Sequence, residues 1–288
     1  MMEQWLVDHE TVIRAYVFYG MLALVALWES LKPAKVPTTS TPVRWLNNIA
    51  LVALDNLVIR WVFPLLAVAF SITVAEHGWG LFNLVALPLW LMLPATVIIL
   101  DLAAYVVHRL LHKVPLLWRL HKVHHADLDY DFTTGLRFHP LESLVTVSST
   151  LLVIAALGAP PVAVIPYEVL FIGAAFFVHG NIHLPQTLDR LLRRCVVTPD
   201  MHRIHHSVDI RESNSNFAGI FSVWDHLFGT YCKDPAAGQD AMVMGLAEYR
   251  DARSLNLPQL LIMPFTRTSS RAGTMQSGVS LDSDTKQS

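Results

Sequence analysis

The sequence predicts an all-α, polytopic integral membrane protein, and its composition is the first reason. Hydrophobic residues make up 53% of the 288-residue chain and charged residues only 15%, with a mean hydropathy of +0.42. A soluble domain carries about 25% charged residues, so this deficit indicates that lipid replaces water around much of the chain. The formal net charge is −2. Because this leaves no basic field to attract nucleic acid, no nucleic-acid partner is expected.

Apolar stretches of suitable length are the second reason, since a helix needs about 20 residues to cross a bilayer. The second of four such stretches, residues 46–74, contains Asp55 and Arg60, so we expect it to be bent or partly interfacial. The fourth is interrupted by LGAPP at 157–161. Because glycine and proline end helices, this stretch predicts two shorter helices in a hairpin, in a layout of about four transmembrane helices. The four stretches cover residues 12–31, 46–74, 84–107 and 144–178.

The distribution of basic residues predicts the orientation of these helices. Lysine and arginine are absent from residues 62–107 and 139–188 and concentrate at 32–44, 109–122 and 190–211. The positive-inside rule places those three segments, and the histidines among them, on the cytoplasmic side. The tail at 266–288 is rich in serine, threonine and glycine and has no aromatic residue, so we expect it to be disordered. Residues 1–265 are then predicted to form one membrane-embedded domain.

Histidines carry the third observation, because they recur at helical spacing. Of the 14 histidines, 11 lie between His108 and His206. Spacings of three and four place side chains on one face of a helix, so each cluster can aim its imidazoles at a common point. Together these side chains exceed the coordination of one metal ion and suit two. The clusters are HRLLH (His108, His112), HKVHH (His121, His124, His125), HGNIH (His179, His183) and HRIHH (His202, His205, His206).

The ligand chemistry favours iron over other metals. Neither of the two cysteines lies in a CxxC motif, so thiolate sites such as iron–sulfur clusters are not expected. HExxH, a zinc-enzyme motif, is absent. A centre held by neutral imidazoles keeps a strong positive charge and reacts with O₂ once electrons arrive.

Other interpretations of the chain stay open at this point. A membrane haem protein would place paired histidines within its spans, and a divalent-metal transporter would need ionisable residues such as Asp55 and Asp101 near the midplane. A metal-stabilised, non-catalytic membrane or scaffold protein would keep the same clusters. Isolated histidines such as His9 and His77 are expected to be interfacial side chains, and His139 and His226 to be structural.

The clustered motifs resemble those of the fatty acid hydroxylase / sterol desaturase superfamily, in a compact bacterial style. The resemblance covers residues 101–231 and rests on DLAAYVVHRLLH, LWRLHKVHH, LRFHPLE, HGNIHLP, TPDMHRIHHS and NSNFAGIFSVWDHLFGTY. It implies four transmembrane helices under a cytosolic helical cap with a non-haem di-iron site. The enzyme would sit in a bacterial inner membrane, with its site and C-terminal tail in the cytoplasm.

The resemblance extends to individual residues. The ligand motifs match His108, His112, His121, His124, His125, His179, His202, His205 and His206. His183 completes the third motif, although relatives often keep only the first histidine of that pair, and Asn181 between them is expected to hold a metal-bound water. Asp101 and Tyr105 share the helical face of His108 and His112, so we expect either to orient an imidazole or line the substrate pocket. Five aspartates lie beside the second and fourth clusters, and we expect some to accept N–H bonds from ligand histidines and most to be solvated loop charges. They are Asp127, Asp129, Asp131, Asp200 and Asp209.

The expected activity is O₂-dependent hydroxylation or desaturation of an unactivated C–H bond in a lipid. The family's acyl, sterol and carotenoid branches share these motifs, so the histidines do not choose the substrate. Because the sequence lacks GxGxxG, CxxC and haem-attachment motifs, electrons are expected from a separate, NAD(P)H-driven carrier protein. Arg190, Arg193, Arg194 and Arg203 are candidates for docking it. Neither the oligomeric state nor the identity of the carrier follows from the sequence.

Overall fold

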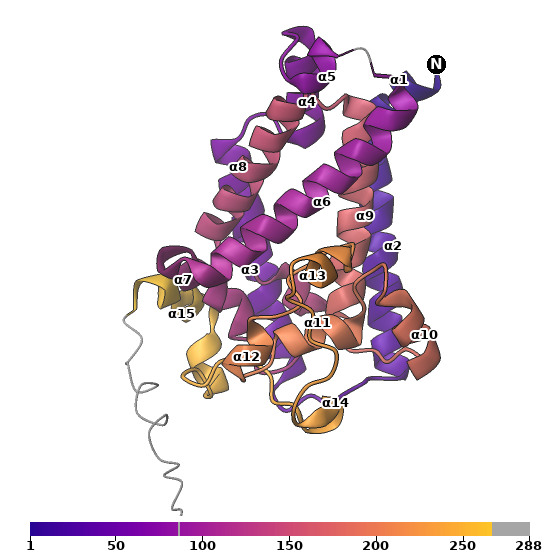
Figure 1. Cartoon of the computed structure of the whole chain (residues 1–288). Coiled ribbons are helices and arrows are strands. Elements are labelled where there is room, and N and C mark those ends of the chain that lie inside the picture. Colours follow the sequence, from indigo (N-terminus) through magenta and orange to yellow (C-terminus); the bar gives the residue numbers. More distant parts are fainter. Residues whose placement is uncertain (86, 267–288) are drawn as a thin grey trace, which may run out of the picture.

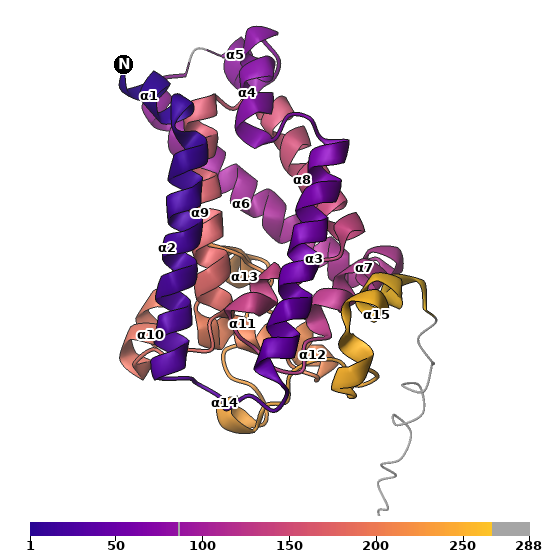
Figure 2. The same ribbon diagram turned by 180° about the vertical axis from the view of Figure 1, so that it is seen from behind.

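Long helices dominate the computed structural model, which describes residues 1–85 and 87–266. No strand occurs among these residues; the only extended pairing described is a single bridge between Ser207 and Met244. The fold is therefore all-α, as predicted. The long helices are α2 (Glu10–Leu31), α3 (Thr41–Val62), α6 (Leu89–Lys113), α8 (Pro140–Leu157) and α9 (Pro161–His179). They run side by side with α6 crossing obliquely (Figures 1 and 2).

Membrane character extends over these helices. Five segments of the described chain are long and apolar enough to cross a bilayer. Large side chains such as Leu57, Trp61 and Leu152 point outward from them and are more than half exposed. An exposed apolar belt of this kind is stable only against lipid, so the protein is an integral membrane protein. The segments are Glu10–Leu31, Thr41–Leu84, Leu89–Lys113, Pro140–Leu157 and Pro161–His179.

Two interruptions divide the apolar stretches: the second stretch is bent, as predicted, and the fourth is broken at the predicted residues. The second apolar stretch breaks after α3 and continues as α4 (Ala67–Glu76) and α5 (Leu81–Leu84). The fourth stretch is the predicted hairpin: α8 ends at Gly158, whose φ of 65° is left-handed, and Pro161 begins α9. Glycine adopts that conformation without strain and proline is tolerated at the first helical position, so these residues end one helix and start the next. Counting this hairpin as two helices gives the five segments.

Short helices gather at the end of the bundle opposite α1 (Met2–Asp8) and α5 (Figure 1). We call this region the cap. Its α7 packs against α3 and α15 through Leu51, Val123 and Leu260, which are fully buried. The cap elements are α7 (Pro115–His125), η1 (Phe132–Leu136), α10 (Gln186–Leu192), α11 (Pro199–His205), α12 (Ile210–Ser213), α13 (Val223–Leu227), α14 (Gly238–Ala241), η2 (Ala252–Leu255), α15 (Leu257–Ile262) and η3 (Met263–Phe265). Apart from Thr266, the predicted disordered tail lies outside the described residues.

Candidate metal centre

Helix ends bring the histidine clusters together. The last turn of α6 carries His112, and Pro115 restarts the chain as α7 after Val114, so the HxxHH motif lies on a new helix. His179 is the last residue of α9. The second HxxHH motif lies on α11, which Pro199 begins and the Thr198 hydroxyl caps by accepting from the amide of Met201. Proline at the first helical position therefore begins both α7 and α11, and α11 also has a side-chain cap.

Nine histidines from these helix ends form two groups, each with its ligand nitrogens within 4.8 Å of one another. We call them the five-histidine group and the four-histidine group. The five-histidine group consists of His108, His112, His121, His125 and His205. The four-histidine group consists of His124, His179, His202 and His206.

Close nitrogen–nitrogen contacts define the five-histidine group. The Nε2 atom of His108 lies 3.1 Å from Nε2 of His121 and 3.0 Å from Nε2 of His205. The Nε2 atoms of His112 and His125 are 3.1 Å apart. Three of these rings also form a hydrogen bond through their outer nitrogen, Nδ1. His108 donates to the carbonyl of Phe217 and His205 to the carbonyl of Ser215. His121 donates to the carboxylate of Glu142. The three Nε2 atoms therefore face inward.

The four-histidine group has similar distances between its nitrogens, but fewer of its imidazoles are held by a hydrogen bond at the outer nitrogen. Nε2 of His179 lies 3.4 Å from Nε2 of His124 and 3.2 Å from Nε2 of His202. The Nδ1 atom of His179 donates to the Ala175 carbonyl at 2.8 Å. In contrast, Nδ1 of His124, Nδ1 of His202 and Nε2 of His206 are buried and have no hydrogen-bond partner among the described residues. Tyr130 covers this group, with its ring against His179 and His206.

Burial keeps the cap imidazoles neutral. It lowers the pKa of His121, His124 and His125 well below the ordinary value of 6.5, and the neighbouring imidazoles lower it further. The same causes lower the pKa of His202. Burial likewise lowers the pKa of His205 and His206. Neutral imidazole is the form that binds metal, so these side chains are ready to act as ligands.

The arrangement fits metal ions better than any set of mutual hydrogen bonds. Two imidazole nitrogens at about 2.1 Å from one ion lie about 3.0–3.4 Å apart for octahedral to tetrahedral angles. The contacts in both groups fall in that range. Neutral imidazole has only one N–H, and in His121 and His205 it is used at Nδ1. The inward lone pairs would therefore repel one another unless a cation lay between them.

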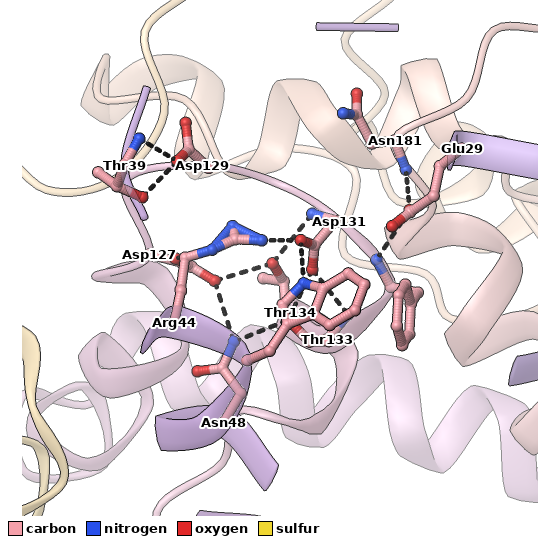
Figure 3. A network of polar contacts seen from close by, with 12 residues as sticks. Glu29, Thr39, Arg44, Asn48, Asp127, Asp129, Asp131, Thr133, Thr134 and Asn181 are labelled. Carbon is pink, nitrogen blue, oxygen red and sulfur yellow. Dashed lines mark hydrogen bonds and ion pairs between the residues drawn. The ribbon is translucent and has the colours of Figure 1, made fainter. Parts of the chain in front are cut away.

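A buried polar network holds the chain that follows α7 (Figure 3). Arg44 on α3 forms ion pairs with Asp127 and Asp131, while Asp129 accepts from the amides and hydroxyls of Thr38 and Thr39. Burial raises the pKa of Asp129, but these four hydrogen bonds outweigh it and leave the pKa lowered. All three aspartates are at most 8% exposed. The expectation that most of the loop aspartates are solvated is therefore wrong for these three, because Thr38 and Thr39 of the loop joining α2 to α3 cover Asp129, and Arg44 of α3 pairs with Asp127 and Asp131.

The remaining predicted site residues have other partners. The carboxylate of Asp101 accepts from the amides of Ile220 and Phe221 and from the indole of Trp224. Tyr105 bonds to the hydroxyl of Thr230 at 2.9 Å. Neither residue forms a hydrogen bond with an imidazole in the described chain, so Asp101 meets the histidines only through the backbone of the 217–224 segment.

Asn181 and His183 lie apart from both groups. The side chain of Asn181 accepts from the amide of Lys35 and donates to its carbonyl. His183 is 38% exposed at its side chain, and its Nδ1 lies 3.0 Å from Asp200. The structure thus brings together nine of the ten predicted histidines and leaves His183 outside.

Glu142 is a site residue that the sequence reasoning missed. It lies in the first turn of α8 within the motif LRFHPLE, is 1% exposed and reaches His121 at 2.6 Å. An ionisable residue at the start of an apolar helix is a signal that could have identified it, because such residues are rare in membrane segments and usually functional. His139 and His226 bond to backbone carbonyls, of Leu261 and Arg193, in agreement with structural roles.

Comparison with known proteins agrees with this geometry. The family model for fatty acid hydroxylase matches residues 93–230, which contain every histidine of both groups. The chain is 28% identical to ornithine lipid hydroxylase OlsE of Rhizobium tropici, over 76% of this chain and 67% of that protein. It is 28% identical to human alkylglycerol monooxygenase over 51% of this chain but only 31% of that protein.

A further relative is a hydroxylase as well. Beta-carotene hydroxylase of a Paracoccus species is 29% identical over 46% of this chain and 83% of that protein. The match to the alkylglycerol monooxygenases spans only about a third of their length. No solved structure matches this chain. On its motifs, its family-model match and these relatives, residues 93–230 form a fatty acid hydroxylase domain of the fatty acid hydroxylase / sterol desaturase superfamily.

Proposed function

We propose that this protein is a lipid hydroxylase or desaturase that uses two histidine-bound iron ions and O₂. The observation that carries the proposal is the pair of adjacent, buried histidine groups, which together offer nine neutral nitrogen ligands and no thiolate. Imidazole nitrogens suit iron among the redox-active metals. The relatives named above are hydroxylases or monooxygenases, and ornithine lipid hydroxylase is named for a lipid. When bound, the metal pair would supply O₂ activation.

The chain itself would supply binding, orientation and a dry environment. Backbone carbonyls of Phe217, Ser215 and Ala175 fix which imidazole nitrogen faces inward. Phe217 packs edge-on against His108, His112 and His205 and keeps water from the five-histidine group. A lipid substrate would approach from the bilayer, along the apolar helices beneath the cap. The alternative of a transporter is not favoured, since Asp101 is fully engaged by three donors.

Electrons would come from a separate NAD(P)H-driven carrier that docks on the cap. Arg190 and Arg194 are exposed there, whereas Arg193 and Arg203 are buried in ion pairs with Asp189 and Asp200. Docking of an acidic carrier therefore falls to the first two. We place the cap, with the basic segments, on the cytoplasmic side of a bacterial inner membrane, following the charge distribution.

Metal analysis combined with turnover tests the proposal. Protein purified without a metal-affinity tag should contain two iron ions per chain, and membranes holding it should convert a lipid only in the presence of O₂ and reductant. Comparison of the lipid profiles of cells with and without the gene identifies the substrate. Two bound ions without any O₂-dependent product would favour the metal-stabilised, non-catalytic alternative, and fewer than one ion per chain would exclude the metal site.

A further inference from the structure

Glu142 is the only carboxylate that contacts a histidine of either group in the described part of the chain. Its Oε1 lies 2.6 Å from Nδ1 of His121, whose Nε2 faces His108 inside the five-histidine group. The side chains of Glu142 and His121 are 1% and 2% exposed. A carboxylate on the outer nitrogen of an imidazole, with a metal position on the inner one, is a recurring arrangement in metal sites.

Other carboxylates buried in the long helices have their own partners. Asp101 accepts from three N–H groups, and Glu29 from the amides of Phe132 and Asn181. Glu168 is paired with Arg14. Glu142 and Asp55 differ from these, because in the described chain each has one carboxylate oxygen without a hydrogen-bond partner and neither forms an ion pair with a lysine or arginine. Asp55 accepts from the hydroxyl of Ser143, whereas Glu142 contacts a histidine of the five-histidine group.

A buried carboxylate with so little compensation is costly. Its position in the first turn of α8 helps, since the helix N-terminus favours an anion, but that effect is small beside the cost of burial. A cation bound at Nε2 of His121 would supply the missing positive charge. The charge of Glu142 thus makes sense with a metal in the five-histidine group.

The two groups differ in how their imidazoles are supported from behind. In the five-histidine group, His108 and His205 donate to carbonyls and His121 to a carboxylate. In the four-histidine group, His179 donates to a carbonyl while Nδ1 of His202 has no partner. Only one group therefore receives negative charge through its ligands.

We propose that Glu142 is a positioning residue that makes the two metal positions unequal. By accepting the Nδ1–H of His121, it holds the Nε2 lone pair inward and makes this imidazole the stronger electron donor. The five-histidine group then binds its divalent ion more tightly and stabilises the more oxidised ion better. This inference rests on the proposed function only in that both require two metal ions.

The test is a metal titration of the full-length protein in detergent micelles. A chelator first removes bound metal, and the protein is then titrated with Zn²⁺ alone in competition with a fluorescent metal indicator. Wild-type protein should take up two ions with distinct dissociation constants. Glu142→Gln keeps an acceptor for His121 but removes the charge. It should raise one dissociation constant by about 10- to 100-fold and leave the other unchanged, as expected for loss of such a carboxylate partner.

Two further variants assign the affected site. With the four-histidine group disabled by His202→Ala, Glu142→Gln should weaken the remaining ion by the same factor. With the five-histidine group disabled by His108→Ala, Glu142→Gln should change nothing. The matched control is Ser143→Ala, one residue along the same helix turn, whose hydroxyl bonds to Asp55 and to no grouped histidine. It should leave both dissociation constants unchanged.

Thermal unfolding of the metal-free proteins separates positioning from a structural role. Glu142→Gln should unfold near the wild-type temperature, because the amide oxygen still accepts from Nδ1–H of His121; a variant that unfolds earlier and weakens both sites equally would overturn the inference. Unchanged binding at both sites would overturn it too. If Glu142→Gln does not fold, Glu142→Asp replaces it in the test. This variant keeps the carboxylate and should bind both ions. Loss of the ion in the four-histidine group from Glu142→Asp would contradict the assignment. Wild-type protein with fewer than two ions would instead refute the proposed function.

Discussion

Trp224 in the cap donates its indole N–H to Oδ2 of Asp101 in the middle of α6, at 2.7 Å. The same carboxylate accepts from the amides of Ile220 and Phe221, so one side chain holds the 217–224 segment against the membrane helix. This segment carries the Phe217 carbonyl that accepts from His108. Asp101 therefore influences a proposed metal ligand through backbone that it anchors.

Asp101→Asn should destabilise the protein. An amide presents an N–H₂ toward donors that need an acceptor, so at least one buried N–H loses its partner, at a cost of about 1–3 kcal/mol. The metal affinity of the five-histidine group should fall as well, because the Phe217 carbonyl loses its anchor. Trp224→Phe removes a single donor and should cost less, about 1 kcal/mol. Unfolding in detergent with and without metal measures both effects, and an Asn variant as stable as wild type would disprove the anchoring role.

Each histidine group should lose its own ion when one of its members is removed. His205→Ala acts on the five-histidine group and His124→Ala on the four-histidine group, so each variant should retain about one tightly bound ion and lose lipid turnover. His183→Ala is the control, because His183 lies outside both groups and is paired with Asp200. Elemental analysis gives the ion content. Loss of an ion from the His183 variant would show that the grouping is incorrect.

Arg44→Met should be strongly destabilising. Arg44 is buried between Asp127 and Asp131, and removing the cation leaves two buried carboxylates without it, which costs about 3–5 kcal/mol. Arg211→Met is the matched control: its ion pair with Asp209 is exposed, so stability should change little. Denaturant or thermal unfolding compares the two. Similar effects of the two substitutions would mean that the buried network does not support the cap.

Acid should destabilise the metal-free protein. Burial lowers the pKa of the cap histidines, including His121 and His206, in the folded state, while in the unfolded chain they take up protons near 6.5. Below pH 6.5 the unfolded state therefore binds more protons, and the free energy of unfolding falls as pH decreases from 7 toward 5. Thermal unfolding across that interval checks the sign. A stability that stays level or rises on acidification would be inconsistent with buried neutral imidazoles.

Much of this architecture was predictable because it depends on local patterns. Apolar length predicted the membrane helices, and LGAPP predicted the break at Gly158 and Pro161 that separates α8 from α9. Helical spacing predicted that His108 and His112 would point the same way, and they share a group. These features need only the geometry of one helix and the conformational limits of proline and glycine.

Partners from distant parts of the chain were not predictable in the same way. Asp101 shares a helical face with His108, yet it contacts Trp224, 123 residues further along. Glu142 carries no histidine-box pattern, and only the approach of α8 to α7 brings it to His121. The aspartates after α7 resemble loop charges in the sequence, but the loop between α2 and α3 covers Asp129, and Arg44 of α3 pairs with Asp127 and Asp131.

The sequence by itself determined the membrane helices, the set of histidines and the face from which each projects. Only the tertiary structure decided how the histidines divide. His205 and His206 are neighbours but belong to different groups, as do His121 and His124 on one helix, whereas His108 and His205 meet at 3.0 Å across 97 residues. Spacing sets the direction of a side chain within its own helix, but the crossing of α6, α7, α9 and α11 sets which nitrogens converge.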